Sequence, residues 1–141
     1  MNIRWMRVVL GALLLELVLL VTLVPISFVD LTLFLTAVPI GCFVFGYLVT
    51  RWVLRTLSSG ALLHGGLIGI AATAMYFGLV VSQPDGLASA IQIYGAPLFW
   101  FSQAMRIAGC LAGGLHQQRR AAARSGPALR QNARSAGNEH V

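Results

Sequence analysis

The segment Val8-Val-Leu-Gly-Ala-Leu-Leu-Leu-Glu16-Leu-Val-Leu-Leu-Val-Thr-Leu-Val24 decides the fold class of this chain. Leu and Val dominate it, and the side chain of Glu16 is the one charged group that it contains. The hydrocarbon core of a bilayer is about 30 Å thick, and about 20 apolar residues cross it as a helix. We therefore predict that a first spanning helix covers residues 8–26.

Three more segments have a comparable length and apolar character, at residues 31–53, 61–81 and 94–115. The stretches between them are mostly short and contain Pro, Gly, Asp or Ser, which favour turns. Helices joined by short connections are normally antiparallel neighbours, so we predict an all-α integral membrane four-helix bundle in up-down-up-down order. Residues 1–116 form this four-transmembrane-helix domain, and Pro97 is expected to bend the fourth span.

The overall composition is typical of a membrane protein. Hydrophobic residues make up 57% of the 141 residues, charged residues make up only 10%, and every basic residue is an arginine. A net charge of +6 can favour nucleic-acid binding, but that function needs a basic face on a folded domain, and the pattern predicts no such domain. We therefore expect the lipid bilayer, and no nucleic acid, as a partner.

The distribution of the arginines predicts the orientation of the bundle. Arginines precede the first span, end the second and follow the fourth, whereas the other two connections carry Asp30 and Asp85 instead. Connections rich in Arg normally stay in the cytoplasm. We therefore predict a multi-pass protein of the bacterial inner (plasma) membrane with both termini cytoplasmic. The arginines on this side are Arg4, Arg7, Arg51, Arg55, Arg119, Arg120, Arg124, Arg130 and Arg134.

Residues 117–141 differ in composition from the spans. Gln, Arg, Ala, Ser, Gly and Asn predominate, with little that could form a core, which predicts a disordered, Arg-rich cytoplasmic tail. Its favoured role is a solvated anchor for the topology. The alternative is contact with anionic lipid, which stabilises binding by about 1 kcal/mol per Arg near the surface.

Two charged residues fall deep inside the predicted spans, Glu16 in the first and Arg106 in the fourth, whereas Arg51 lies at the end of the second. A charge at the centre of a spanning helix costs about 2.5 to 3.5 kcal/mol on insertion scales, so each residue is expected to have a partner. At a rise of 1.5 Å per residue, both lie roughly 12 Å from the arginine-rich side. We predict that they form an intramembrane ion pair that links the first span to the fourth.

The surroundings of Arg106 support this pairing. Ser102, Gly109 and Gly113 recur on its helical face, and Gln103 lies one step round the helix. The Gly109-x-x-x-Gly113 spacing lets another helix approach closely, so Arg106 is expected to face protein rather than lipid. The fourth span has few strong hydrophobes, and we expect it to insert only with the help of the other spans and of Glu16.

Other residues of the spans are assigned structural roles. His64, close to the cytoplasmic end of the third span, is interpreted as a structural histidine rather than a proton relay. A stripe of small residues in the third span predicts a packing face, and a homodimer or larger membrane complex through the glycine faces is a further hypothesis. Two cysteines are expected to pack as small apolar residues. These residues are Gly65, Gly69, Ala72 and Tyr76 in the stripe, and Cys42 and Cys110.

The sequence predicts no catalytic, cofactor-binding or metal site, because it lacks the usual hydrolase and metalloprotease motifs and paired carboxylates on one helix. The leading hypothesis is a non-enzymatic accessory or structural membrane protein with a buried Glu-Arg pair. The alternative is a small proton-coupled transporter or exporter in which Glu16 titrates.

Two resemblances bear on these hypotheses. The run Leu14-Leu15-Glu16-Leu17 is similar to the first span of small multidrug exporters, in which such a carboxylate binds protons and cationic drugs in turn. That likeness is limited to one residue, and we reject it as an assignment. As a whole the chain resembles small, uncharacterised four-span inner-membrane proteins of bacteria, with a Glu in span one and the Arg106-Ile-Ala-Gly109 stretch in span four. This resemblance implies no activity.

Overall fold

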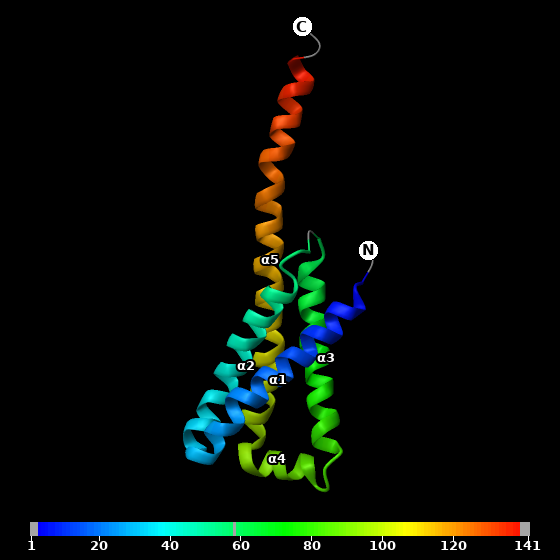
Figure 1. Ribbon diagram of the computed structural model, residues 1–141. Helices are drawn as coiled ribbons and strands as arrows, with labels where there is room; N and C mark the ends of the chain where they lie inside the picture. The colour runs from blue at the N-terminus through cyan, green and yellow to red at the C-terminus, as the bar shows by residue number, and fades with distance from the viewer. Residues whose placement is uncertain (1–2, 58, 139–141) are drawn as a thin grey trace.

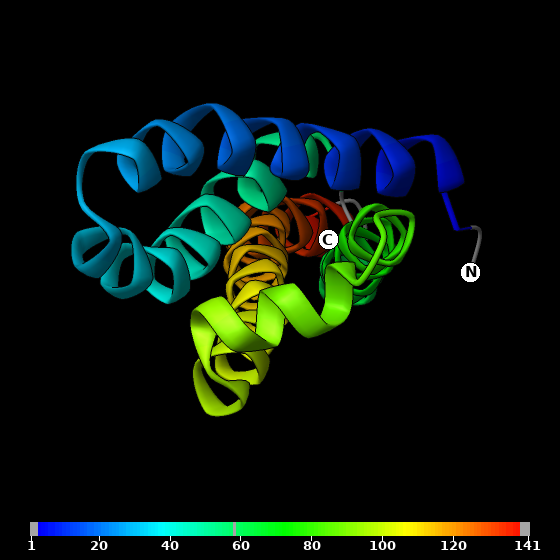
Figure 2. The ribbon, with the colours of Figure 1, turned by 90° about the horizontal axis from the view of Figure 1, so that it is seen from below.

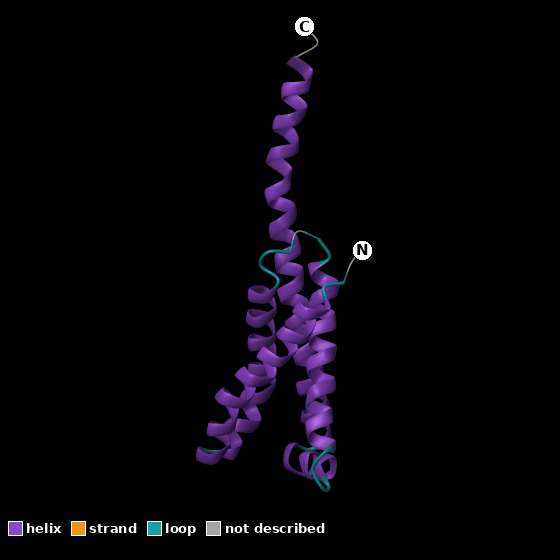
Figure 3. Cartoon of the chain, turned by 45° about the vertical axis from the view of Figure 1, so that its right-hand side comes forward, coloured by secondary structure: helices purple, strands orange, loops and turns teal. Residues whose placement is uncertain are grey.

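The computed structural model describes residues 3–57 and 59–138, and within them the chain is entirely helical, with five helices and no strand (Figures 1 and 3). The helices are α1 (Trp5–Val29), α2 (Leu31–Val53), α3 (Ala61–Val81), α4 (Gly86–Tyr94) and α5 (Ala96–Asn138). Three of them, α1, α2 and α3, are long and apolar enough to cross a membrane. The chain is therefore a helical membrane protein.

The helices α1 and α2 form a hairpin with a very short connection. The predicted connection between the first span, which was expected to end at residue 26, and the second is reduced to Asp30, because α1 continues past Pro25 to Val29. The Asp30 carboxylate accepts hydrogen bonds from the backbone N–H groups of Thr32 (2.7 Å) and Leu33 (3.1 Å). This N-cap satisfies amides that the first turn of α2 would otherwise leave unpaired.

The bundle is held together by the packing of α5 and of α1 on α2 and α3. The first part of α5 packs along α2 and α3, and α1 packs alongside α2 and crosses α3 steeply (Figure 2). In the part of the chain that the structure describes, α1 and α5 have no extended contact. The two helices that the predicted ion pair would link therefore do not pack along each other, because α2 and α3 lie between most of their lengths.

The short helix α4 has no counterpart in the prediction, which treated the residues before 94 as a connection. It lies across the ends of α3 and α5 (Figures 1 and 2). Gly95 adopts a φ of 71° between α4 and α5, a conformation that glycine reaches without steric cost. Pro97 is consequently the second residue of α5 and starts this helix instead of bending it, since a first-turn residue needs no amide donor.

The segment after residue 116 also differs from the predicted disorder. Helix α5 continues through Asn138 and projects beyond the other helices (Figure 1). Ala, Arg and Gln are good helix formers, and a helix that is already nucleated extends at little cost. Residues 139–141 lie outside the described residues.

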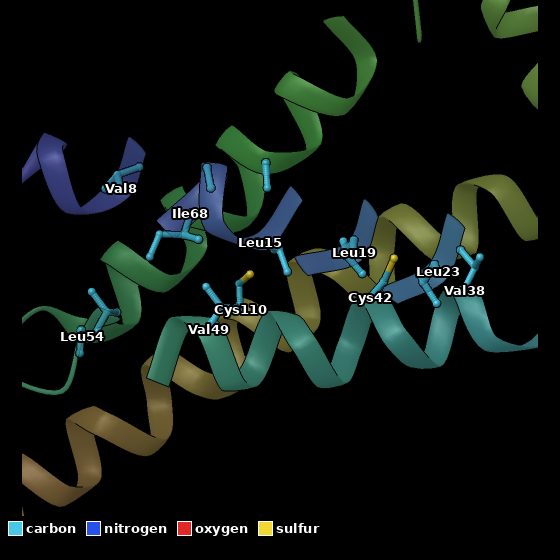
Figure 4. Packing of buried hydrophobic residues seen from close by; sticks show 13 residues of the cluster. Val8, Leu15, Leu19, Leu23, Val38, Cys42, Val49, Leu54, Ile68 and Cys110 are labelled. Carbon is cyan, nitrogen blue, oxygen red and sulfur yellow. The ribbon is translucent and has the colours of Figure 1, made fainter. Parts of the chain in front are cut away.

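The core lies where α1 crosses the other helices. Leu15, Leu19 and Leu23 recur at helical spacing on α1 and are buried beside Val38 and Cys42 of α2 (Figure 4). The opposite side of α1 carries exposed large apolar residues. Apolar side chains on both the inner and the outer faces are typical of helices that are surrounded by lipid. The exposed residues on α1 include Leu10, Leu13, Leu17, Leu20 and Val21.

Candidate functional site

The structure brings Glu16 and Arg106 together. Arg106 Nη1 lies 2.8 Å from Glu16 Oε1, and the two side chains are 4% and 10% exposed, respectively. This distance is that of an ion pair, but within residues 3–57 and 59–138 the oxygen has no partner with hydrogen-bond geometry. The contact is therefore mainly an attraction between charges, which is strong where water is excluded.

The guanidinium group of Arg106 also contacts α3. Its Nη1 donates to the backbone carbonyl of Ala72 at 3.4 Å, and its central carbon lies 4.7 Å from the centre of the Tyr76 ring. A cation over an aromatic ring gains about 0.5 to 2 kcal/mol, depending on burial. Arg106 of α5 thus reaches Glu16 of α1 along the surface of α3, which explains how two helices with little mutual packing are linked.

Sequence reasoning identified Ala72 and Tyr76 as a packing stripe but missed their contact with Arg106. Their spacing was the available signal, because residues four apart on a helix share one face. An aromatic ring and a small residue on that face can receive a long cationic side chain. The sequence does not say which helix lies beside this face of α3, so it could not identify Arg106 as the cation.

The residues predicted to support Arg106 lie on the buried face of α5. Ser102 donates its hydroxyl hydrogen to the carbonyl oxygen of Leu98 at 2.8 Å. Gln103 is 6% exposed, and its Oε1 has no hydrogen-bond partner among the described residues. A buried amide oxygen normally has a partner, because leaving it unpaired costs about 1 to 3 kcal/mol.

Gly109 and Gly113 lie one and two turns from Arg106 and face α2. An added Cβ at Gly109 would overlap the carbonyl oxygen of Phe43, and one at Gly113 would lie 2.6 Å from that of Tyr47. The helix that approaches these glycines is therefore α2. Gly65 and Gly69 of α3 likewise contact α5. The glycine faces of the predicted third and fourth spans are therefore both covered by other helices of the same chain.

His64 lies apart from the ion pair, in the first turn of α3. It is 2% exposed, its Nδ1 lies 2.8 Å from the carbonyl oxygen of Gly60, and its Nε2 accepts from the backbone N–H of Arg4 at 3.1 Å. In these two contacts Nε2 is the acceptor, which leaves Nδ1 as the donor to Gly60. His64 therefore ties the start of α1 to α3.

A second polar contact at the same end of the bundle was not predicted. Gln117 Nε2 donates to the carbonyl oxygen of Arg51 at 2.7 Å, and the Tyr47 hydroxyl lies 3.2 Å from His116 Nδ1. Partial burial, together with the positive charges of Arg51 and Arg120, lowers the pKa of His116 from its ordinary value. The contacts of Gln117 and His116 hold α5 against the C-terminal part of α2.

A cavity of about 400 Å³ adjoins the ion pair. Glu16, Gln103 and Arg106 form its polar end, and its other walls are mainly aliphatic and aromatic side chains from all five helices. Its volume is within the range of small-molecule sites, roughly 300 to 1,000 Å³. The aromatic wall residues are Phe34, Tyr76, Tyr94 and Phe99, with ring centres 5.7 Å apart for Phe34 and Tyr94.

No family model, curated protein or solved structure matches this chain. Its function must therefore follow from the chemistry of the ion pair and of the cavity beside it.

Proposed function

We propose that this chain is a non-enzymatic integral membrane protein with an accessory or structural role, in which a buried ion pair links the first span to the fourth. The observation that supports this most directly is the 2.8 Å contact between Arg106 Nη1 and Glu16 Oε1. A charge buried alone in a membrane is costly, whereas two opposite charges in contact offset much of that cost. The pair therefore favours one arrangement of α1 and α5 over others.

We further propose four spans, with α5 as the fourth. Its sequence is less apolar than α1, α2 and α3, which are the three helices that qualify by composition. It nevertheless packs along both α2 and α3, from Phe99 near its start to Gln117 beside Arg51. A helix that accompanies two spanning helices over their length would cross the same membrane as they do.

The proposed orientation places both ends of the chain in the cytoplasm of a bacterium. The start of α1, the connection between α2 and α3, and the projecting end of α5 lie toward one end of the bundle (Figure 1). These segments carry the arginines outside the core, and the opposite end carries Asp30 and Asp85. Anionic lipid of the inner leaflet would attract exposed Arg119 and Arg120 where α5 leaves the bundle.

A double-mutant cycle tests the role of the pair. Glu16→Gln and Arg106→Gln should each lower the free energy of unfolding by about 3 to 5 kcal/mol, because each leaves one buried charge without its partner. The variant with both substitutions should lose much less than the sum of the single losses. Thermal unfolding in detergent and abundance in membranes are the measurements.

Asp85→Asn provides a matched control, since it removes one carboxylate from an exposed residue, and it should change neither quantity. Exchanging the pair, with Glu16→Arg and Arg106→Glu, should restore abundance only in part. The exchange leaves the Ala72 carbonyl and the Tyr76 ring without their cation. Strictly additive losses in the cycle would contradict the proposed linkage.

The second candidate function is proton-coupled transport with Glu16 as the titrating group, and the cavity that Glu16 lines is the observation that favours it. In that case Glu16→Gln should leave the protein abundant and folded but abolish pH-dependent uptake into vesicles. Loss of abundance in Glu16→Gln would instead support the structural role.

A further inference from the structure

The polar end of the cavity has hydrogen-bonding capacity that the described chain does not use. Gln103 Oε1 and Arg106 Nε are buried and have no hydrogen-bond partner within that part of the protein. Both side chains line the cavity and are more than nine-tenths buried. A small polar group at this end could donate to the amide oxygen and accept from the guanidinium N–H once the two side chains turn these buried atoms toward the cavity.

The ion pair restricts the charge of such a group. Glu16 and Arg106 already neutralise each other, so a cationic or anionic head in the cavity would leave one charge uncompensated at low dielectric. An uncharged head avoids that cost. A hydroxyl group suits the site, because it is one donor and an acceptor at the same atom.

The walls of the cavity indicate how a ligand would reach it. Leu20 of α1 and Leu79 of α3 both line the cavity and are 50% and 56% exposed, respectively. They lie on the apolar surfaces that face lipid in a membrane. The cavity therefore meets the hydrocarbon region, and a lipophilic molecule can enter it without passing through water.

We propose that this cavity binds a neutral lipophilic hydroxy compound taken up from the bilayer. Its hydroxyl group lies among Gln103, Arg106 and Glu16, and its apolar part lies between the α1–α2 hairpin and the aromatic side chains of α3, α4 and α5. This inference goes beyond the structural role proposed above, since the ion pair can link α1 to α5 whether or not the cavity is occupied.

Photolabelling with matched competitors tests the proposal. The probe is dodecanol that carries an aliphatic diazirine in its chain, applied to the full-length protein in vesicles of phosphatidylethanolamine and phosphatidylglycerol. Labels located by mass spectrometry should concentrate on cavity residues such as Phe34, Val38 and Tyr94. Unlabelled dodecanol should compete about tenfold better than dodecylammonium or dodecanoate, which corresponds to about 1.4 kcal/mol.

Two substitutions on α1 distinguish labelling inside the cavity from labelling of the general lipid-facing surface. Leu20→Trp places a bulky ring at the cavity wall and should reduce labelling of the cavity about tenfold, if the cost of binding rises by about 1.4 kcal/mol. Leu17→Trp is the matched control, because Leu17 is 57% exposed on the same helix and is not part of the wall. In the Leu17→Trp variant, labelling of the cavity should equal that of the unsubstituted protein.

Gln103→Leu tests the polar end at nearly constant side-chain volume. Loss of one hydrogen bond should weaken competition by dodecanol about threefold to tenfold. Equal labelling of all lipid-facing residues, equal labelling of the two tryptophan variants, or stronger competition by dodecylammonium would each overturn the proposal. None of these outcomes alters the double-mutant cycle of Glu16 and Arg106, so the two proposals fail independently.

Discussion

At the scale of single residues, the absence of a side chain at Gly109 is as important as the charge of Arg106. The carbonyl oxygen of Phe43 occupies the space that a Cβ at Gly109 would need, so α2 and α5 touch through their backbones. This close approach fixes how far Arg106 projects past α3 toward Glu16. The position of the ion pair therefore depends on a glycine one turn away on α5.

Gly109→Ala should consequently destabilise the protein strongly, because the methyl group can be accommodated only by separating α2 from α5. We expect a loss of about 1 to 3 kcal/mol in the free energy of unfolding, the usual cost of overpacking. The measurement is unfolding in detergent followed by far-ultraviolet circular dichroism.

Gly78→Ala is the control for the same substitution in another helix. A Cβ at Gly78 meets no described atom within 4 Å, and alanine favours helix over glycine. Stability should stay constant or rise by about 0.5 to 1 kcal/mol. Equal losses in the two variants would show that the contact with Phe43 is unimportant.

The sequence could predict Glu16 and Arg106 as partners because depth along a span follows from residue number alone. The contacts of Arg106 with Ala72 and Tyr76 could not be predicted in the same way. They depend on which helices are neighbours, and that is decided by side-chain shape at many positions, such as the glycines that admit α2 and α3 beside α5. For the same reason the cavity has no signal in the sequence.

At the scale of helices, sequence reasoning succeeded where the apolar pattern is long and failed where it is short. The predicted second and third spans agree with α2 (Leu31–Val53) and α3 (Ala61–Val81). Helix α4 was missed because a nine-residue helix between two turns has too few residues to show a period. The helical continuation of α5 was missed because its composition alone also suits a disordered segment.

The fourth proposed span should not insert independently. Residues 96–115, placed in a glycosylation reporter in microsomes, should insert poorly, because Arg106 near their centre opposes insertion. Arg106→Leu changes the apparent insertion free energy by roughly 3 kcal/mol, enough to make insertion predominant. Residues 8–26 should insert without help despite Glu16. Efficient insertion of the unsubstituted fourth segment would contradict its dependence on the bundle.

At the scale of the whole molecule, the helices diverge toward the end that carries Asp30 and Asp85. The α1–α2 hairpin forms one leg and α3, α4 and α5 form the other (Figure 3). The legs meet where Gly109 and Gly113 of α5 contact the backbone of α2, and the cavity lies between the legs, lined in part by the ion pair. The pair joins α1 of one leg to α5 of the other, so it can hold the legs together beside the cavity that it lines.

The number of spans and the orientation can be tested with one set of fusions. Green fluorescent protein at the C-terminus should fluoresce, since it folds in the cytoplasm, and alkaline phosphatase fused after Pro84 should be active, since it needs the periplasm. Phosphatase fused after Ser59, between α2 and α3, should be inactive. Three spans instead of four would place the C-terminus and Pro84 on the same side, and the fluorescence would be lost.

The same fusions connect the ion pair to the topology. If α5 enters the bilayer only because Glu16 offsets the charge of Arg106, Glu16→Gln should lower the fluorescence at the C-terminus while phosphatase after Pro84 stays active, because α1, α2 and α3 still insert. Adding Arg106→Gln should restore the fluorescence, since the fourth span then carries no charge. Unchanged fluorescence in Glu16→Gln would mean that α5 inserts through its packing on α2 and α3 alone, with the pair forming only afterwards.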